Sequence, residues 1–418
     1  MAVLLYNIIL FLFRSGIFIA SWFNPKAKKW IQGRKGIMKS LQKAIPPNEK
    51  LIWMHCASLG EFEQGRPVLE KMKKNFPDYR MLLTFFSPSG YESQKKYSGA
   101  DWVFYLPLDG PATAKKFLEI TNPSLVIFVK YEFWYYYLKK ISYRKIPLIL
   151  VSALFRKDMS FFKWYGGLQQ KMLSRFDHLF VQNISSLELL QGIGLGNISS
   201  ISGDTRFDRV QQIAKNAESL PLIEQFLHSQ QCIVAGSTWP EDEEILFKAW
   251  RWLDHLPLKW IIAPHEISAK HLSQLKQEYT GSILYSELLN DPSLNSSVLI
   301  IDNVGMLSRL YRYSWISYVG GGFIKMGVHN VLEPAAFSKP VVIGPFYKKY
   351  MEATGLVNTG GGLVVENEKE LIDLIQAMFN EKQRYNSSAL ASGKFVAEHS
   401  GATKRILEYI QENRLLTI

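Results

Sequence analysis

Glutamate residues that follow apolar segments give this 418-residue chain groups suited to proton transfer. Glu61 lies in the segment WMHCASLGEFEQGRPVLE, where an apolar strand gives way to a tight turn and then to a helical pattern. A carboxylate at that position lies beside main-chain N–H groups and can face a bound alcohol, so Glu61 has the properties of a general base. The alternative is that Glu61 or Glu63 only caps the helix, as early acidic residues often do.

Two charged residues elsewhere in the N-terminal half are further candidates. Glu132, in VIFVKYEFWYYYL, directly follows an apolar strand. Its alternative is an exposed position at the start of a helix whose aromatic side chains pack inward. Arg206, in GDTRFDRV, can neutralise a phosphate or the carboxylate of an acidic sugar. The alternative for Arg206 is a surface ion pair with Asp204 or Asp208.

The C-terminal half contains a glycine-rich segment, YVGGGFIKMGVHNVLEPAAFSKPVVIGP, that joins a strand to a loop, a helix and another strand. Its three consecutive glycines are Gly320, Gly321 and Gly322. They allow a phosphate to approach main-chain N–H groups, and the next helix offers its positive N-terminus. The spacing matches neither a P-loop nor the dinucleotide fingerprint, which disfavours hydrolysis of a nucleoside triphosphate.

Glu333 follows this loop and can accept hydrogen bonds from two vicinal ribose hydroxyls. Helix capping is its alternative. Because His329 and Asn330 lie in the same turn beside the glycines, we favour ligand binding over capping. The segments AGSTWPEDEE and APHEIS agree with this interpretation, since each also follows a predicted strand.

Alternating strands and helices predict an α/β protein with parallel sheets, which would place these residues at the carboxyl ends of strands. The first series of strands is LIWMHCAS, YRMLLTFF, DWVFYLPL, PSLVIFV, IPLILVSAL and DHLFVQN, and the second is CIVAGST, LKWIIAP, SILYSEL, VLIIDN, WISYVGG and KPVVIGP. A polar, helix-prone connector separates the two series. We therefore expect two Rossmann-like lobes, residues 51–218 and 219–418, with ligand bound between them.

An apolar run near the N-terminus, VLLYNIILFLFRSGIFIASWF, predicts a membrane anchor over residues 1–23. Arg14 in its middle costs about 2.5–3.5 kcal/mol in a spanning helix, so spanning and interfacial helices both remain open. Residues 24–50 form a predicted basic linker that contains Lys26, Lys28, Lys29, Arg34, Lys35, Lys39 and Lys43. These charges predict a body on the cytoplasmic side. A cleaved signal peptide is disfavoured because no basic residue precedes the run.

Composition limits the class of protein and its partners. Hydrophobic residues make up 47% of the chain and charged residues 21%, which indicates a folded protein. A formal charge of +12 favours polyanions, such as anionic lipids or phosphorylated substrates. Nucleic acid ranks last, because no basic groove motif accompanies the charge. The two cysteines lack metal-ligand spacing and indicate neither a zinc site nor a disulfide framework.

Taken in order, the segments ASLGEFEQGRPVLE, YEFW, GDTRFD, AGSTWPEDEE, APHE and VGGGFIKMGVHNVLEPAAFSKPVVIGP resemble the 3-deoxy-D-manno-octulosonic acid (Kdo) transferases of lipopolysaccharide assembly. The resemblance covers almost the whole chain. It implies a GT-B fold, an inverting transfer from CMP-Kdo to a lipid A precursor, and a place at the inner membrane. It also implies that no metal or other cofactor is required.

The resemblance also implies roles for particular residues. Glu61 would be the catalytic base, and Glu132 and Arg206 would stabilise the transition state. The positions that would bind the CMP moiety are Pro264, His265, Val304, Gly305, Met306, Asn330, Val331, Leu332 and Glu333, with Gly321 and Gly322 in the phosphate loop. Three places depart from the family pattern. Arg206 replaces a usual lysine, and His265 stands where many relatives have arginine. The segment VSALFRKD lacks the usual Asn-Ala-Arg pattern, which leaves Arg156 as its only counterpart.

Two other functions fit parts of the pattern. Another GT-B enzyme, such as a UDP-sugar transferase or epimerase, would share the fold and the phosphate loop. A membrane-tethered lipid-binding protein without catalysis would share the anchor and the charge, although Glu61 argues against it. Competition between CMP and UDP would separate the first alternative from Kdo transfer.

Overall fold

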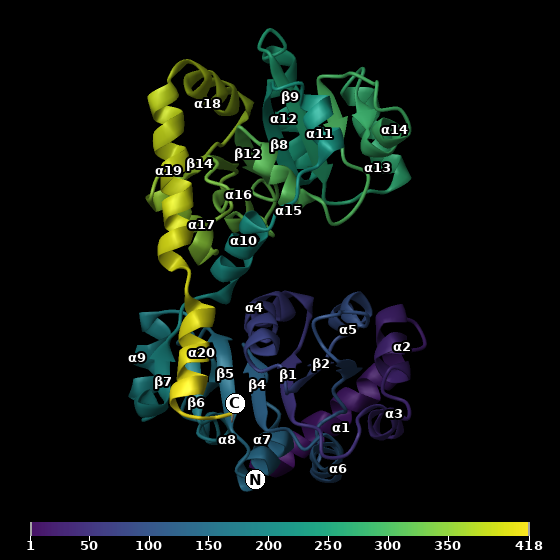
Figure 1. Ribbon diagram of the computed structural model, residues 1–418, viewed down its shortest axis with the longest axis vertical. Helices are drawn as coiled ribbons and strands as arrows, with labels where there is room; N and C mark the ends of the chain where they lie inside the picture. Colours follow the sequence, from purple (N-terminus) through teal and green to yellow (C-terminus); the bar gives the residue numbers. More distant parts are fainter. Residues whose placement is uncertain (1, 417–418) are drawn as a thin grey trace. The chain divides into compact units, whose positions relative to one another are not determined.

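The computed structural model describes residues 2–416, so the ends of the predicted anchor (residue 1) and of the predicted C-terminal lobe (residues 417 and 418) lie outside the described residues. The chain divides into two compact units. The N-terminal unit comprises residues 1–209 and 401–418, and the C-terminal unit comprises residues 210–400. Figure 1 shows both units, each with helices around a central sheet.

The N-terminal unit is built on a parallel sheet with strand order β3-β2-β1-β4-β5-β6-β7. Its strands are β1 (Leu51–Cys56), β2 (Arg80–Phe85), β3 (Trp102–Tyr105), β4 (Leu125–Val129), β5 (Leu148–Ala153), β6 (His178–Val181) and β7 (Ser199–Ile201). Its helices are α1 (Ala2–Ala20), α2 (Pro25–Gln32), α3 (Ile37–Ala44), α4 (Leu59–Asn75), α5 (Pro88–Gln94), α6 (Pro111–Thr121), α7 (Tyr135–Tyr143), α8 (Gly167–Leu173), α9 (Ile184–Gly192), the first part of α10 (Thr205–Lys215), and α20 (Ala402–Glu412).

Both faces of this sheet are buried, as expected for parallel strands that read as continuous apolar runs. Along β1, Leu51 and Trp53 join one hydrophobic cluster, whereas Ile52 and Met54 join the other. The alternation follows from the two-residue period of a strand. The strand order reverses between β1 and β4, so the residues that follow these two strands meet at one point of the sheet edge.

The C-terminal unit has a second parallel sheet, with order β10-β11-β9-β8-β12-β13-β14. Its strands are β8 (Gln231–Thr238), β9 (Leu258–Pro264), β10 (Ile283–Leu284), β11 (Val298–Ile300), β12 (Ile316–Val319), β13 (Val341–Ile343) and β14 (Gly362–Val364). Its helices are α11 (Pro221–Leu227), α12 (Pro240–Trp252), α13 (Ala269–Glu278), α14 (Tyr285–Asn290), α15 (Leu307–Leu310), α16 (Leu332–Ala335), α17 (Met351–Asn358), α18 (Glu368–Asn380) and α19 (Lys382–His399). The order reverses between β8 and β12.

Every predicted strand is present, and one further strand lies at an edge of each sheet. β7 and β14 are each three residues long, and neither has a long apolar run, so the apolar pattern missed them. Two Rossmann-like units in one chain confirm the expected GT-B fold (Figure 1).

Residues 24–50 are not a linker, which corrects the prediction. They form α2 and α3, and Trp30, Ile37 and Leu41 are buried. Arg34, counted among the basic flank, is half-buried, and its guanidinium donates to the carbonyl oxygens of Leu106, Trp30 and Phe86. The prediction failed because alternating lysines hid a short apolar stripe at helical spacing.

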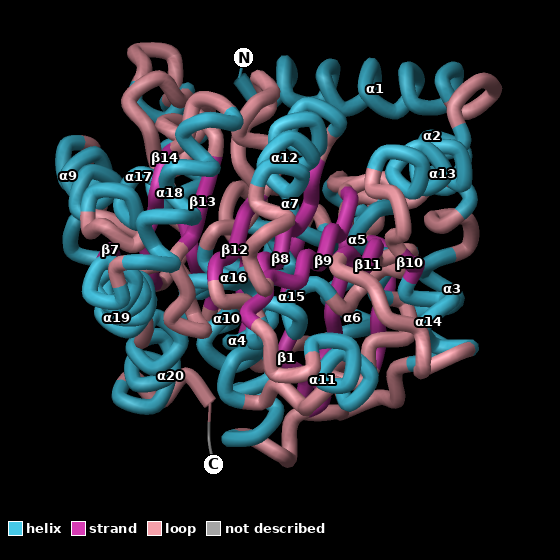
Figure 2. The backbone as a smooth tube through the Cα atoms, turned by 90° about the horizontal axis from the view of Figure 1, so that it is seen from above, coloured by secondary structure: helices cyan, strands magenta, loops and turns pink. Residues whose placement is uncertain are grey.

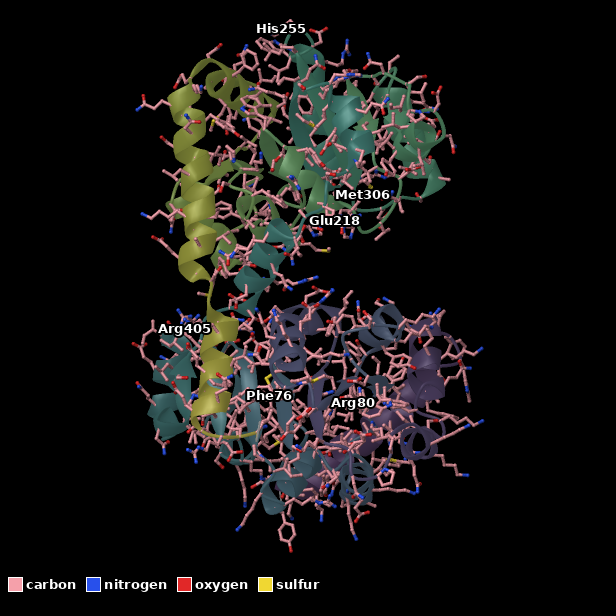
Figure 3. The ribbon with its side chains drawn as sticks, in the orientation of Figure 1. Phe76, Arg80, Glu218, His255, Met306 and Arg405 are labelled. Atoms are coloured by element: carbon pink, nitrogen blue, oxygen red, sulfur yellow. The ribbon has the colours of Figure 1, made fainter. Side chains whose placement is uncertain are left out.

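The C-terminal residues also depart from the predicted division. Residues 401–418 were assigned to the C-terminal lobe, whereas the structure places them in the N-terminal unit, and the first boundary lies at 209 rather than 218. The α20 helix explains this placement, because its Ile406, Leu407 and Ile410 join a core cluster with residues of β1, β2 and α4. Figure 3 labels Arg405 on α20, whose side chain donates to the carbonyl oxygen of Ser202.

Candidate functional site

Glu61 lies in the first turn of α4, directly after β1. Its Oε2 atom accepts a hydrogen bond from the main-chain N–H of Ala57, so the capping contact considered from the sequence is present. The pKa of Glu61 is raised to about 7, mainly because the carboxyl group is partly buried. Repulsion from the charge of Glu132 raises this pKa further. The Ala57 hydrogen bond and the charge of Lys130 act in the opposite direction. A carboxyl group with a pKa near neutrality suits general-base work better than a simple cap requires.

Glu132 follows β4 and is buried, so its predicted alternative as an exposed residue is wrong. Its Oε2 atom lies 2.7 Å from Nε2 of His55 and accepts from the indole N–H of Trp134 at 2.6 Å. Both partners contact the same carboxylate oxygen. The carboxyl group is therefore held in one orientation at the point where the strand order reverses, and its charge acts on Glu61.

His55 is the residue at this site that the sequence analysis missed. It is fully buried in β1, and its Nδ1 atom lies 2.9 Å from Oγ1 and 3.1 Å from the carbonyl oxygen of Thr84. Thr84 Oγ1 in turn accepts from the indole N–H of Trp53. One sequence signal was available: a histidine inside an apolar strand needs hydrogen-bond partners on both ring nitrogens.

Arg206 lies at the start of α10, and its guanidinium pairs with Asp204, with one N···O distance of 2.7 Å. The ion-pair alternative is thus present in the structure. The same helix start contacts α4, because the Thr205 hydroxyl donates to the main-chain carbonyl of Gln64, one turn beyond Glu61. Arg206 therefore lies on an element that touches the helix of the candidate base.

In the C-terminal unit, Asp242 organises the glycine-rich segment. Its carboxylate accepts from the hydroxyl of Tyr318 at 2.7 Å and from the main-chain N–H groups of Trp239 and Gly321 at 2.9 and 2.8 Å. Gly321 N–H is therefore already occupied, and the Gly320 N–H donates to the carbonyl of Gly236. This corrects the prediction that these two N–H groups face a phosphate.

Close packing of the backbone accounts for the flanking glycines. A Cβ atom at Gly320 would lie 2.3 Å from the carbonyl oxygen of Ser237, and one at Gly322 would lie 2.4 Å from the nitrogen of Gly344. Gly321 has a φ of +88°, a conformation that favours glycine. The expected helix after the loop is only the single turn of α16, so its dipole is small.

A pocket of about 270 Å³ lies beside this segment within the C-terminal unit. Its lining includes Gly305, Asn330 and Glu333, three of the predicted donor-binding residues, together with Ser237 and His329. The amide of Asn330 donates to Oε1 of Glu333 at 3.0 Å. The volume is near the lower end of small-molecule sites, about 300–1,000 Å³.

The remaining predicted donor-binding residues differ in accessibility. The side chains of Val331, Leu332 and Met306 are buried, so only their main-chain groups could meet a ligand. Val304 is exposed. Met306 is labelled in Figure 3 and precedes α15.

An aromatic stack stands at the carboxyl ends of β8 and β9. The ring of His265, directly after Pro264 at the end of β9, lies 4.7 Å from the rings of Trp239 and His329. The indole N–H of Trp239 donates to Nε2 of His329 at 2.9 Å. Burial lowers the pKa of His329, and charge repulsion from His265 lowers it further. A lowered pKa favours the neutral imidazole, whose Nε2 can accept the hydrogen bond from Trp239. His329 lines the 270 Å³ pocket, and His265 stacks on His329, so the stack holds His265 near this pocket.

Among the described residues, no group of three or more His, Cys, Asp or Glu side chains is placed to hold a metal ion. Cys56 and Cys232 are free and buried. The expectation that the reaction needs no metal stays a prediction.

Comparison with known proteins shows similarity along most of the chain. The family model for 3-deoxy-D-manno-octulosonic-acid transferase (kdotransferase) matches residues 30–209, which end where the first segment of the N-terminal unit ends. The 3-deoxy-D-manno-octulosonic acid transferase of Aquifex aeolicus is 31% identical over 79% of this chain and 87% of its own length. That of Haemophilus influenzae is 26% identical over 93% of this chain and 92% of its own.

Solved structures share the fold. UDP-GlcNAc 2-epimerase from Neisseria meningitidis superimposes with a TM-score of 0.60 over 87% of this chain and 100% of its own, at 15% identity. An identity this low shows a common fold alone.

Proposed function

Because this chain belongs to the family of 3-deoxy-D-manno-octulosonic acid transferases, we propose that it moves Kdo from CMP-Kdo to a lipid A precursor. The chain is a glycosyltransferase, and the donor and acceptor are the parts that we propose. The main support is Glu61, a half-buried carboxyl group with a pKa near 7 at the switch point of its sheet. That pKa lets the group accept a proton near neutral pH.

In the proposed reaction, Glu61 removes the proton from an acceptor hydroxyl while that oxygen attacks the anomeric carbon of Kdo. The bond from that carbon to the phosphate oxygen breaks, and CMP leaves with the electron pair. A single displacement inverts the anomeric configuration. Glu132 and Arg206 would stabilise the transition state, and the pocket beside Glu333 would bind the CMP moiety.

We also propose attachment to the inner membrane with the body on the cytoplasmic side. Within residues 2–416, one helix, α1, is long and apolar enough to cross a membrane. Lys26, Lys28 and Lys29 follow it on α2, and a basic flank is typical of the cytoplasmic side. The same charges favour an anionic membrane surface and a phosphorylated lipid acceptor.

A transfer assay tests this function. Purified full-length protein is given CMP-Kdo and a tetraacylated lipid A precursor in detergent, and the products are followed by mass spectrometry. We expect the mass of one or more Kdo residues to be added, and CMP but not UDP to inhibit. Transfer from a UDP-sugar would favour the UDP-sugar alternative, for which the shared fold is the support. No transfer from any donor would favour a lipid-binding protein.

A further inference from the structure

The α1 helix contacts its own unit near both its ends and in its middle. Near the N-terminal end, the Tyr6 hydroxyl donates to Oδ2 of Asp109 at 2.7 Å, and the Tyr136 hydroxyl donates to Oδ1 of Asn7 at 2.9 Å. In the middle, the Phe13 ring lies 5.8 Å from that of Trp30 and 5.9 Å from that of Phe86. Its C-terminal half runs beside α2, as Figure 2 also shows.

Two opposite faces of α1 differ in exposure, and apolar residues between them, such as Leu4 and Phe11, are exposed as well. Val3, Tyr6, Leu10, Phe13 and Ile17 are spaced three or four residues apart, so they share the face toward the unit, and four of them are half-buried. The outer face carries Leu5, Ile8, Leu12 and Ile19, which are 57%, 47%, 62% and 57% exposed. An outer face this apolar needs a covering, and residues 2–416 leave it exposed.

Arg14 stands on the flank between these faces, two turns after Asn7. It lines a cavity of about 790 Å³ that α1 shares with α2 and α3, and the lining also contains Lys35 and the apolar Phe18, Ile31 and Met38. Positive charge at the rim of an apolar hollow complements an anionic headgroup whose acyl chain lies alongside.

Length alone does not decide how α1 meets a membrane: 19 residues extend about 28 Å at 1.5 Å per residue, close to a hydrocarbon core of about 30 Å. The contacts decide it. Asp109 is buried and also accepts from the main-chain N–H groups of Tyr136 and Tyr137 at the start of α7. A spanning α1 would either break the bond from Tyr6 to this carboxyl group or carry α7 into the hydrocarbon, and both are costly.

We propose that α1 is an in-plane helix whose outer face of Leu5, Ile8, Leu12 and Ile19 enters one leaflet of an anionic phospholipid membrane, while Arg14 and Lys35 face the lipid phosphates. This inference rests on the membrane attachment proposed above and not on the transfer reaction. It explains an arginine within an apolar helix, because the arginine stays at headgroup depth.

Depth-dependent fluorescence quenching tests the proposal on the full-length chain. Leu5→Cys, Leu12→Cys and Ile19→Cys each take one thiol-reactive fluorophore, since native Cys56 and Cys232 are buried. The proteins are reconstituted in vesicles of phosphatidylethanolamine and phosphatidylglycerol with nitroxides at shallow or deep acyl positions. We expect the shallow nitroxide to quench all three labels most, and to similar extents. A spanning helix would instead place the label at position 12 deep, quenched most by the deep nitroxide, and the labels at positions 5 and 19 shallow. If neither nitroxide quenched any of the three labels, α1 would not contact the membrane. Either result overturns the proposal.

Charge is tested with Arg14→Gln carrying the Leu12 label. We expect partition into the anionic vesicles to weaken about fivefold for the lost charge, and to change little in phosphatidylcholine vesicles. If partition weakened equally in anionic and in phosphatidylcholine vesicles, the proposed contact between Arg14 and the lipid phosphates would be wrong. Because quenching does not depend on turnover, an inactive transfer assay leaves both results interpretable.

Discussion

Glu61 combines a structural contact with a chemical property. Its carboxylate caps the start of α4, yet burial and the neighbouring Glu132 raise its pKa to about 7. The cap and the base are therefore compatible roles, and the two must be separated by experiment. The pH dependence of rate and of stability provides that separation.

We expect the turnover of the wild-type enzyme to rise with pH, with its midpoint near pH 7, and to level off above it. The reason is that a general base acts only when deprotonated. Glu61→Gln cannot accept a proton, so kcat should fall about 10²–10⁴-fold and lose this dependence. Rates measured from pH 5.5 to 8.5 check both points. Glu132→Gln is the matched control: an active Glu61→Gln beside an inactive Glu132→Gln would make Glu132 the better candidate for the base.

Stability supplies an independent readout for Glu61. The pKa of its carboxyl group is about 7 when folded and 4.5 in the reference state, so the folded protein holds an extra proton between these values. Its contribution to stability is complete below pH 4.5 and is lost as the pH rises through 7. The Tm of the wild type should therefore fall relative to that of Glu61→Gln across this window. A constant difference would count against the raised pKa.

His55 acts on the site through Glu132. In His55→Asn the carboxylate loses the ring nitrogen that lies 2.7 Å from its Oε2 atom and helps to fix its orientation. We expect a lower kcat with an unchanged KM for the donor. We also expect the pH midpoint to shift, because the charge of Glu132 raises the pKa of Glu61 and a reoriented Glu132 would act on it differently. Trp134→Phe removes the other donor to the same oxygen and should shift the midpoint in the same direction. A loss of Tm with normal kcat would give His55 a purely structural role.

Helices at the two ends of the chain complete the N-terminal unit. The α20 helix fills part of the core with Ile406, Leu407 and Ile410, and Asp208 accepts main-chain N–H bonds from Gly401 and Thr403 at its start. Carboxylate bonds to N–H groups at a helix start stabilise it. The N-terminal unit thus depends on residues nearly 200 positions away in sequence.

Truncating a buried side chain of α20 tests that dependence. Ile406 is fully buried, so Ile406→Ala should lower the free energy of unfolding by about 2–5 kcal/mol through lost burial and a residual cavity. Urea denaturation measures the change. Leu390→Ala on α19 is the control, since its exposed side chain should alter stability by less than about 0.5 kcal/mol. Equal effects of the two substitutions would contradict the packing of α20.

At the scale of the whole molecule, the chain enters the C-terminal unit once at residue 210 and leaves it at residue 400. The candidate base and its partners all belong to the N-terminal unit, whereas the 270 Å³ pocket belongs to the C-terminal unit. Binding of the donor and activation of the acceptor should therefore respond to different substitutions.

Calorimetry with CMP on the full-length protein measures this division. We expect Glu333→Ala to weaken CMP binding at least tenfold, because two charge-assisted bonds to ribose hydroxyls are worth about 1.5–3 kcal/mol each. Glu61→Gln should bind CMP with unchanged affinity. Unaltered binding by Glu333→Ala would give Glu333 a structural role, such as its hydrogen bond with Asn330.

The sequence by itself determined the alternation of strands and helices, the GT-B organisation and the positions of Glu61 and Glu132 after their strands. These features follow from local patterns of apolar residues, whose periods a single chain displays. The same patterns missed two edge strands and the short helices α2 and α3. Lysine-rich or very short segments carry too few apolar residues to show a period.

Only the tertiary structure decided which groups meet. Strand order brings Glu132 to His55 across 77 residues, and it gives the N–H of Gly321 to Asp242 rather than to a ligand. It also returns α20 to the first unit and lays one face of α1 along it. Such contacts depend on the order and register of strands, and a local period carries no information about which distant segment will pack beside it.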